Sequence, residues 1–169
     1  MPYFAAAVAR TADGWTGREV DLSEVEDLDA LADELRDLAG DDDGPALLLF
    51  DEDDEYFALV RVAGGGSLAE PRVFLSDVRA VQASDVAAML WEAAVEEEVD
   101  DDDEDDDEDE GTRAVSEPVG DSALLGDLGT SSGDLLDLCA TEGLLPADVL
   151  VAVAERAGFA DVLDELRPV

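Results

Sequence analysis

The sequence predicts the α+β fold class: an N-terminal antiparallel sheet with helices on one face, an acidic disordered linker and a small all-α C-terminal module. Three observations support this. Apolar runs of strand length, separated by turn residues, dominate the first half of the chain. A block of acidic residues follows residue 95, and beyond it apolar residues recur only at helical spacing. We therefore expect an α+β domain over residues 1–95, a linker over 96–116 and a helical module over 117–169.

The first two elements are predicted to be a β-hairpin. Residues 3–10 form an apolar run typical of a strand, and residues 15–20 supply a second strand. Asp13-Gly14 lies between them, and this dipeptide strongly favours a tight turn. The two strands should therefore pair in antiparallel order.

A helix is predicted next, beginning at Ser23. Glu26 stands three residues later, which is the spacing of a capping box. Gly40 is expected to end the helix. The apolar residues that recur at helical spacing and form its buried face are Val25, Leu28, Leu31, Ala32, Leu35 and Leu38.

Two further strands are predicted after this helix. Residues 46–50 are a continuous apolar run typical of a buried strand, and residues 56–62 are rich in β-branched and aromatic side chains. The acidic residues 51–55 between them are predicted to form a solvated turn. Their alternate acids also resemble a calcium loop, but Tyr56 and Val62 stand where such a loop requires Gly and Glu.

A loop, a strand and a helix are predicted to complete the N-terminal domain. Gly64-Gly65-Gly66 is interpreted as a flexible connection, because a phosphate-binding loop would end in Gly-Lys-Ser/Thr and open a helix. Residues 72–75 form the strand. A helical stretch follows to about Ala94, with a break near Ser84.

The acidic block occupies residues 96–110, where Val99 is the only residue that is not acidic. Neighbouring carboxylates repel one another even in water, and the block has almost no apolar surface to bury. We therefore predict a solvated, disordered linker. A solubilising spacer is the simplest interpretation of this run, and a mimic of nucleic acid that occupies a basic protein surface is the alternative.

Short helices are predicted to follow the linker. The first covers residues 121–128 and the last covers residues 159–166. Between them, Ser131 and Asp134 have the spacing of a helix cap, and Pro146 suits the first turn of the next helix. We expect the apolar faces of these helices to be the specific contact with a partner.

The residue composition excludes several catalytic classes. The 169 residues include no His, no Lys and a single Cys, Cys139, which excludes His general bases, multi-Cys zinc sites and Schiff-base chemistry. Cys139 is predicted to be a core residue. Among 47 acidic residues, no pair stands out as an acid–base pair. We therefore predict a non-enzymatic protein with no catalytic, metal-binding or cofactor-binding residues and no cofactor.

Charge limits the partners as well. The chain has 9 basic residues and a formal net charge of -38. The helix–turn–helix of residues 135–157 has only Arg156 nearby as a cation, whereas phosphate binding needs Lys or Arg, so direct nucleic-acid binding is not expected. Residues 1–9 lack the basic region of a signal peptide, and no apolar stretch reaches membrane-spanning length. A cytoplasmic protein with no membrane partner is predicted.

A family resemblance rests on the order of several segments. They are YFAAAVARTADGW, DLDALADELRDLAGDDD, ALLLFDEDDEYFALVRV, PRVFLSD and, after the acidic insert, VGDSALLGDLGTSSGDLLDLCATEGLLPADVLVAVAERAGFADVLDELR. Together they resemble the tRNA adenosine deaminase-associated protein family of high-GC bacteria, over most of the chain except about residues 95–115. The resemblance implies a gene close to a tRNA adenosine deaminase gene, and it carries over no catalytic or binding residue.

The resemblance and the composition together narrow the function. The deaminase needs a zinc site of His and Cys together with a Glu, so this chain is not the deaminase itself. We expect a non-enzymatic accessory protein that contacts a tRNA adenosine deaminase or another basic protein. An acidic decoy or chaperone-like binder of basic nucleic-acid-binding proteins is the alternative. A carboxylate-based enzyme of unknown substrate is the third hypothesis.

Overall fold

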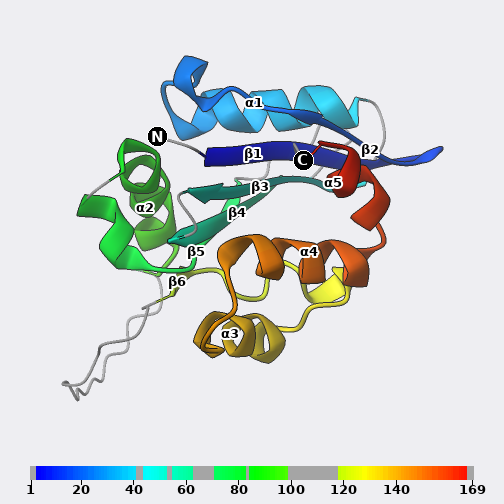
Figure 1. Cartoon of the computed structure of the whole chain (residues 1–169). Coiled ribbons are helices and arrows are strands. Elements are labelled where there is room, and N and C mark those ends of the chain that lie inside the picture. The colour runs from blue at the N-terminus through cyan, green and yellow to red at the C-terminus, as the bar shows by residue number, and fades with distance from the viewer. Residues whose placement is uncertain are drawn as a thin grey trace.

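A single antiparallel sheet lies at the centre of the molecule, and its strand order in the described residues is β2-β1-β3-β4-β5-β6 (Figure 1). The computed structural model of the chain describes residues 3–40, 44–52, 55–62, 71–82, 84–98 and 118–166, with the backbone alone for 93–98. The strands are β1 (Tyr3–Thr11), β2 (Gly14–Glu19), β3 (Ala46–Glu52), β4 (Tyr56–Val62), β5 (Arg72–Leu75) and β6 (Val119–Gly120).

Helices cover both faces of this sheet, so the described elements form three layers (Figure 1). One face is covered by η1 (Leu22–Glu24), α1 (Leu28–Ala39), η2 (Val78–Gln82) and α2 (Asp85–Glu98). The opposite face is covered by η3 (Gly126–Leu128), α3 (Ser132–Ala140), α4 (Pro146–Ala157) and α5 (Ala160–Leu166). The helices before the acidic run therefore share one face, as predicted, and those after it bury the other.

Coverage of both faces explains why the strands have continuous apolar sequences. Successive side chains of a strand point to opposite faces of the sheet. In β3, Leu48 and Phe50 pack in the cluster under α1 and α2, whereas Leu47 and Leu49 pack in the cluster over α3 and α4. All four side chains are fully buried. A strand buried on both faces needs apolar residues at every position, so no polar alternation is left in its sequence.

The α+β class is confirmed, but the segment after the acidic run is not entirely helical as predicted. Val119 and Gly120 form β6, which pairs with Leu75 and Phe74 at the edge of the sheet. A strand of two residues is too short to produce an apolar alternation that sequence analysis would recognise. This strand joins the C-terminal helices to the same sheet that the first half of the chain builds.

The start of α1 also differs from the prediction. Asp27, not Ser23, is the N-cap of α1, and its side chain accepts a hydrogen bond of 2.9 Å from the Ala30 N–H. Ser23 lies in η1, where Asp21 is the capping residue and accepts from the Ser23 N–H. Two capping sites lie close together in the sequence, and their residue types do not show which of them begins the longer helix. The end of the helix at Gly40 is confirmed.

The predicted break near Ser84 is confirmed, because η2 ends at Gln82 and α2 begins at Asp85. The Ser84 hydroxyl accepts a hydrogen bond of 3.2 Å from the Ala87 N–H at the start of α2. The helix continues to Glu98, so residues 96–98, expected at the start of the linker, are helical. The rest of the predicted linker and the Gly64-Gly65-Gly66 loop lie outside the described residues.

Candidate functional site

One end of the sheet carries a row of polar side chains on the face that α1 and α2 cover. Tyr3 on β1 pairs with Glu52 on β3, and Glu52 pairs with Tyr56 on β4. The next pair on the same face of β1 and β3 is Ala5 with Phe50, and both residues belong to the core under the two helices. The row therefore lies where that core ends, at the boundary with solvent.

An open hollow of about 520 Å³ lies beside this row, between η1 and the first turn of α2. This volume is within the range of roughly 300–1,000 Å³ that is typical of ligand sites. Its apolar wall consists of Leu22, Val25, Phe50, Val86 and Met89. Its polar rim consists of Tyr3, Ser23, Glu26, Glu52, Ser84 and Asp85. We refer to it below as the η1–α2 hollow.

Hydrogen bonds fix the orientation of Glu52 in this hollow. The Tyr56 hydroxyl donates to Glu52 Oε1 at 3.0 Å and lies 3.0 Å from Ser84 Oγ. A carboxylate accepts hydrogen bonds, so the Tyr56 hydroxyl donates its hydrogen bond to Glu52, and the Ser84 hydroxyl donates to the Tyr56 oxygen. Burial, with a smaller contribution from the charge of Glu52, raises the pKa of Tyr56 well above its usual value. Tyr56 therefore stays a hydrogen-bond donor at every physiological pH.

Tyr3 separates the η1–α2 hollow from a second hollow of about 420 Å³, which Glu19 and Asp21 also line. The Tyr3 hydroxyl accepts the Leu22 N–H at 3.1 Å and lies 3.4 Å from Asp21 Oδ1, to which it donates. Hydrogen bonds from Ser23 lower the pKa of Asp21. Tyr3 is 40% exposed even though these bonds hold its end in place. Its ring is therefore an anchored aromatic surface between two acidic rims.

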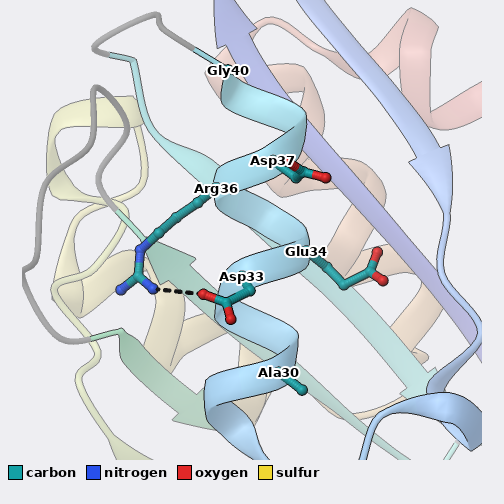
Figure 2. Close-up of a pocket in the computed structure, with 6 residues that line it drawn as sticks. All are labelled: Ala30, Asp33, Glu34, Arg36, Asp37 and Gly40. Atoms are coloured by element: carbon teal, nitrogen blue, oxygen red, sulfur yellow. Dashed lines mark hydrogen bonds and ion pairs between the residues drawn. The ribbon is translucent and has the colours of Figure 1, made fainter.

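The outward side of α1 is acidic, and Figure 2 shows three of its carboxylates along the helix. Asp33 pairs with Arg36 at 3.3 Å, and Glu34 pairs with Arg18 at 2.8 Å. Within the described part of the chain, Asp37 has no ion pair with a basic side chain. We call Asp33, Glu34 and Asp37 the acidic face of α1.

The apolar faces of the C-terminal helices pack against the sheet, although Leu136, Leu145 and Val151 stay exposed, so contact of this segment with a partner stays a prediction. Leu135, Leu150 and Leu163 are buried in the cluster that these helices form with the sheet. The apolar faces are used in folding because the second face of the sheet has to be covered. Burial raises the pKa of Cys139, which packs against the same cluster, to about 12. This shift favours the unreactive thiol form, and the predicted core position of Cys139 is consistent with it.

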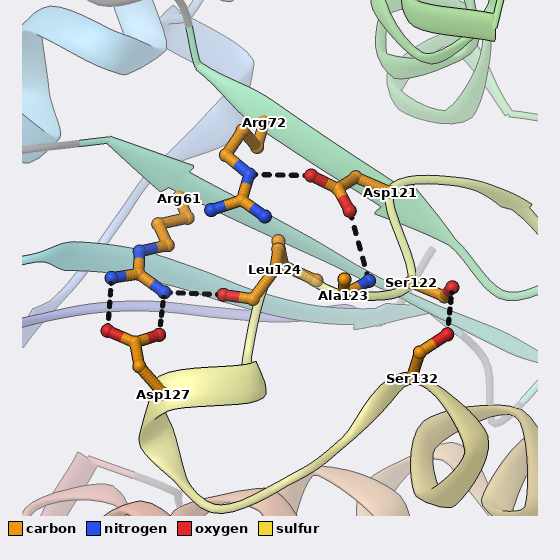
Figure 3. Close-up of polar contacts among 8 residues, drawn as sticks. All are labelled: Arg61, Arg72, Asp121, Ser122, Ala123, Leu124, Asp127 and Ser132. Atoms are coloured by element: carbon orange, nitrogen blue, oxygen red, sulfur yellow. Dashed lines mark hydrogen bonds and ion pairs between the residues drawn. The ribbon is translucent and has the colours of Figure 1, made fainter. Parts of the chain in front are cut away.

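Two ion pairs fix the C-terminal segment to the sheet (Figure 3). Arg61 and Arg72 are neighbours across β4 and β5. Arg61 binds Asp127 through two contacts, and Arg72 binds Asp121. Hydrogen bonding to Arg61 lowers the pKa of Asp127 to about 2. These groups have a structural role at a junction, and none of them faces the η1–α2 hollow.

Comparison with known protein families gives one result for this chain. A family model described as Rv3753c-like tRNA adenosine deaminase-associated protein matches residues 3–160. The chain belongs to this family. No match was found among curated proteins or among solved structures. The matched span includes every strand and α1 to α4, so the family resemblance deduced from the sequence is confirmed.

The sequence of this deaminase-associated protein predicts no site residue, and the row of Tyr3, Glu52 and Tyr56 is evident only from the strand pairing. The acidic residues 51–55 were interpreted as a solvated turn. The turn exists, since the Glu55 N–H donates to the Glu52 carbonyl at 2.9 Å, but Asp51 is only 5% exposed and belongs to β3. The available signal was the pairing of two strands through a short turn, which places Glu52 beside Tyr56.

Other kinds of site find no support in the described residues. The described residues contain no group of three or more His, Cys, Asp or Glu side chains placed to hold a metal ion. None of their helices is both long enough and apolar enough to cross a membrane. The η1–α2 hollow and the acidic face of α1 are the described features considered below.

Proposed function

We propose that this protein is a non-enzymatic accessory protein that binds a tRNA adenosine deaminase through protein–protein contact in the cytoplasm. The family description, which names an association with that enzyme, supports the choice of partner. The sequence lacks the His that a deaminase zinc site of the His-Cys-Cys type needs, which supports an accessory role.

The observation that carries this proposal is the acidic surface on the α1 side of the sheet. Carboxylates line α1 and both hollows, and the whole chain has a formal net charge of -38. Such a surface repels the phosphates of tRNA and attracts basic protein surfaces. Enzymes that bind tRNA need basic surfaces, so the deaminase has the charge that this protein's surface favours.

The alternative is an acidic decoy or chaperone-like binder of basic nucleic-acid-binding proteins. The acidic run of residues 96–110 favours this alternative, because its 14 acidic residues attract basic surfaces without geometric selection. The two functions differ in their specificity. An accessory protein selects one enzyme, whereas a decoy binds many basic proteins with similar affinity.

A titration with matched variants tests the proposal. One variant neutralises the acidic face of α1 with Asp33→Asn, Glu34→Gln and Asp37→Asn. The control neutralises three exposed acids of α5 with Asp161→Asn, Asp164→Asn and Glu165→Gln, so both variants lose the same net charge. We expect the α1 variant to bind purified deaminase more weakly than the α5 variant does. Equal losses in both variants would favour the decoy, and no binding by the wild type at low salt would refute contact with the deaminase.

A further inference from the structure

We propose that the η1–α2 hollow binds an arginine side chain of a basic partner protein. This inference rests on the proposed function, because it names the group through which the partner is anchored. Net charge alone does not say where the basic partner binds, whereas this inference names one pocket on this protein and one kind of side chain on the partner.

The walls of the hollow suit the aliphatic part of a long basic side chain. Val25, Val86 and Met89 are half-buried and line it, and Phe50 closes it from the sheet side. Tyr3 adds an exposed aromatic ring at the rim, 5.7 Å from the ring of Phe50. A guanidinium group stacks favourably on such a ring. The methylene stem of arginine therefore has apolar neighbours, and its head has an aromatic one.

The charges of the hollow are all negative. Glu26, Glu52 and Asp85 line it, and none of the ion pairs found in the described residues involves any of the three. Tyr56 orients Glu52 through the hydrogen bond described above. A cation therefore complements the charge of the hollow, and one of the carboxylates that would receive it is already held in position.

Arginine fits this arrangement better than the other cations. A guanidinium is planar, weakly hydrated and able to bind a carboxylate through two parallel hydrogen bonds. Lysine presents a strongly hydrated point charge that loses more on entering an apolar hollow. The carboxylates of the hollow do not form a metal-binding group in the described residues. Buried arginines are also frequent among the residues that dominate protein–protein affinity.

A peptide experiment on the full-length protein tests the pocket without the deaminase. The probes are the capped tripeptide Gly-Arg-Gly and the same peptide with citrulline, which has nearly the same shape but no charge. We expect the arginine peptide to shift the NMR signal of the Met89 methyl group, with a Kd on the order of millimolar, as is typical of a single side chain. Equal shifts with citrulline, or shifts spread over acidic residues elsewhere, would overturn the proposal.

Variants locate the binding. Glu52→Gln should lower the affinity for the arginine peptide about tenfold, because it removes the negative charge that binds the desolvated guanidinium. Glu26→Gln, at an exposed position, should weaken binding of the peptide to a smaller extent. Glu155→Gln is the matched control, since Glu155 is exposed on α4 on the opposite side of the sheet. Equal affinity in Glu52→Gln and Glu155→Gln, with both variants folded, would refute the assignment.

Failure of the proposed partner and failure of the pocket assignment give different results. If the arginine peptide binds at the hollow but the deaminase does not bind at all, the pocket stands and the proposed partner is wrong. If the deaminase binds equally well to Glu52→Gln and Glu155→Gln and the peptide does not bind, the partner stands and the pocket assignment falls.

Discussion

Arg61 of β4 and Asp127 of η3 form a two-point ion pair between the sheet and the segment that follows the acidic run (Figure 3). The distances are 2.6 Å from Nη1 to Oδ1 and 2.9 Å from Nη2 to Oδ2. Arg61 also donates to the Leu124 carbonyl, so one side chain of β4 holds both ends of a short turn. Together with the ion pair between Arg72 and Asp121, this contact fixes the C-terminal segment to the sheet.

Asp127→Asn should lower the free energy of unfolding by about 1 kcal/mol at pH 7, since the carboxylate is largely exposed but its partner Arg61 is mostly buried. The pKa of Asp127 is lowered from 3.8 to about 2 in the folded protein. Its contribution is therefore complete above pH 3.8 and is lost as the pH falls toward 2. Chemical denaturation of both proteins at several pH values measures the difference.

Asp164→Asn is the control for this prediction, because Asp164 is exposed on α5 and has no ion pair within the described residues. Its effect at pH 7 should stay within about 0.5 kcal/mol. A wild-type advantage over Asp127→Asn that stays constant from about pH 5 to about pH 2 would show that the ion pair does not cause it.

Leu31→Ala should lower the free energy of unfolding by about 2–5 kcal/mol, because Leu31 is fully buried between α1 and the sheet. Asp33→Ala, on the outward side of the same helix, loses only an exposed pair with Arg36 and should stay within about 0.5 kcal/mol. Urea denaturation gives both values. Similar effects at the two positions would contradict the orientation of α1.

Helix faces could be predicted from the sequence more reliably than helix ends or sheet coverage. The apolar spacing of Leu31 and Leu35 is repeated over several turns, so it outweighs local exceptions. The cap of α1 depends on a single hydrogen bond, and Asp21, Ser23 and Asp27 all have a side chain suited to make one. Propensity does not decide between them, because the difference arises from how the chain enters the helix.

The second covered face of the sheet was recognisable in principle. Leu47 and Leu49 are as apolar as Leu48 and Phe50, which a sheet with one solvated face does not need. The helices that cover Leu47 and Leu49 come from beyond the acidic run, and their apolar faces were expected to bind another protein. Amphipathic helices have the same sequence pattern whether they pack on their own chain or on a partner. Only the tertiary structure distinguishes the two.

The η1–α2 hollow was not predictable from local patterns. Tyr3 and Glu52 are far apart in the sequence, and only the antiparallel pairing of β1 with β3 makes them neighbours. The register sets which residues share a row, because a shift by one residue would turn Glu52 to the other face. The pairing of Glu52 with Tyr56 was closer to prediction, since one short turn joins their strands.

Gly120→Ala should destabilise the protein by about 2–4 kcal/mol, because Gly120 has a φ of 103° and an added Cβ would overlap the Val73 carbonyl oxygen. Gly126→Ala is the control, since a Cβ added at Gly126 would meet nothing within 4 Å. Thermal melting of both variants measures the effect. An unchanged melting temperature in Gly120→Ala would mean that β6 adds nothing to the sheet.

Cys139 should react slowly with iodoacetamide at about pH 8 in the folded protein. Burial raises the pKa of its thiol to about 12, so the reactive thiolate is scarce. Unfolding in urea should restore the reactivity of an ordinary thiol. Mass spectrometry of quenched samples gives the two rates, and equal rates in the presence and absence of urea would contradict the buried position.

The acidic run should affect the association rate with the deaminase more than the dissociation rate. A variant of the same length, in which every acid of residues 100–110 becomes Asn or Gln, loses eleven negative charges without losing chain. Charges outside a specific contact mainly accelerate encounter, so the association rate should fall while the dissociation rate stays nearly constant. The difference from the wild type should vanish near 1 M salt, where the screening length is about 3 Å. Stopped-flow or surface-based kinetics with purified deaminase measures both rates. If the dissociation rate rises by the same factor as the association rate falls, the run contacts the deaminase in the complex and does not act only by long-range attraction.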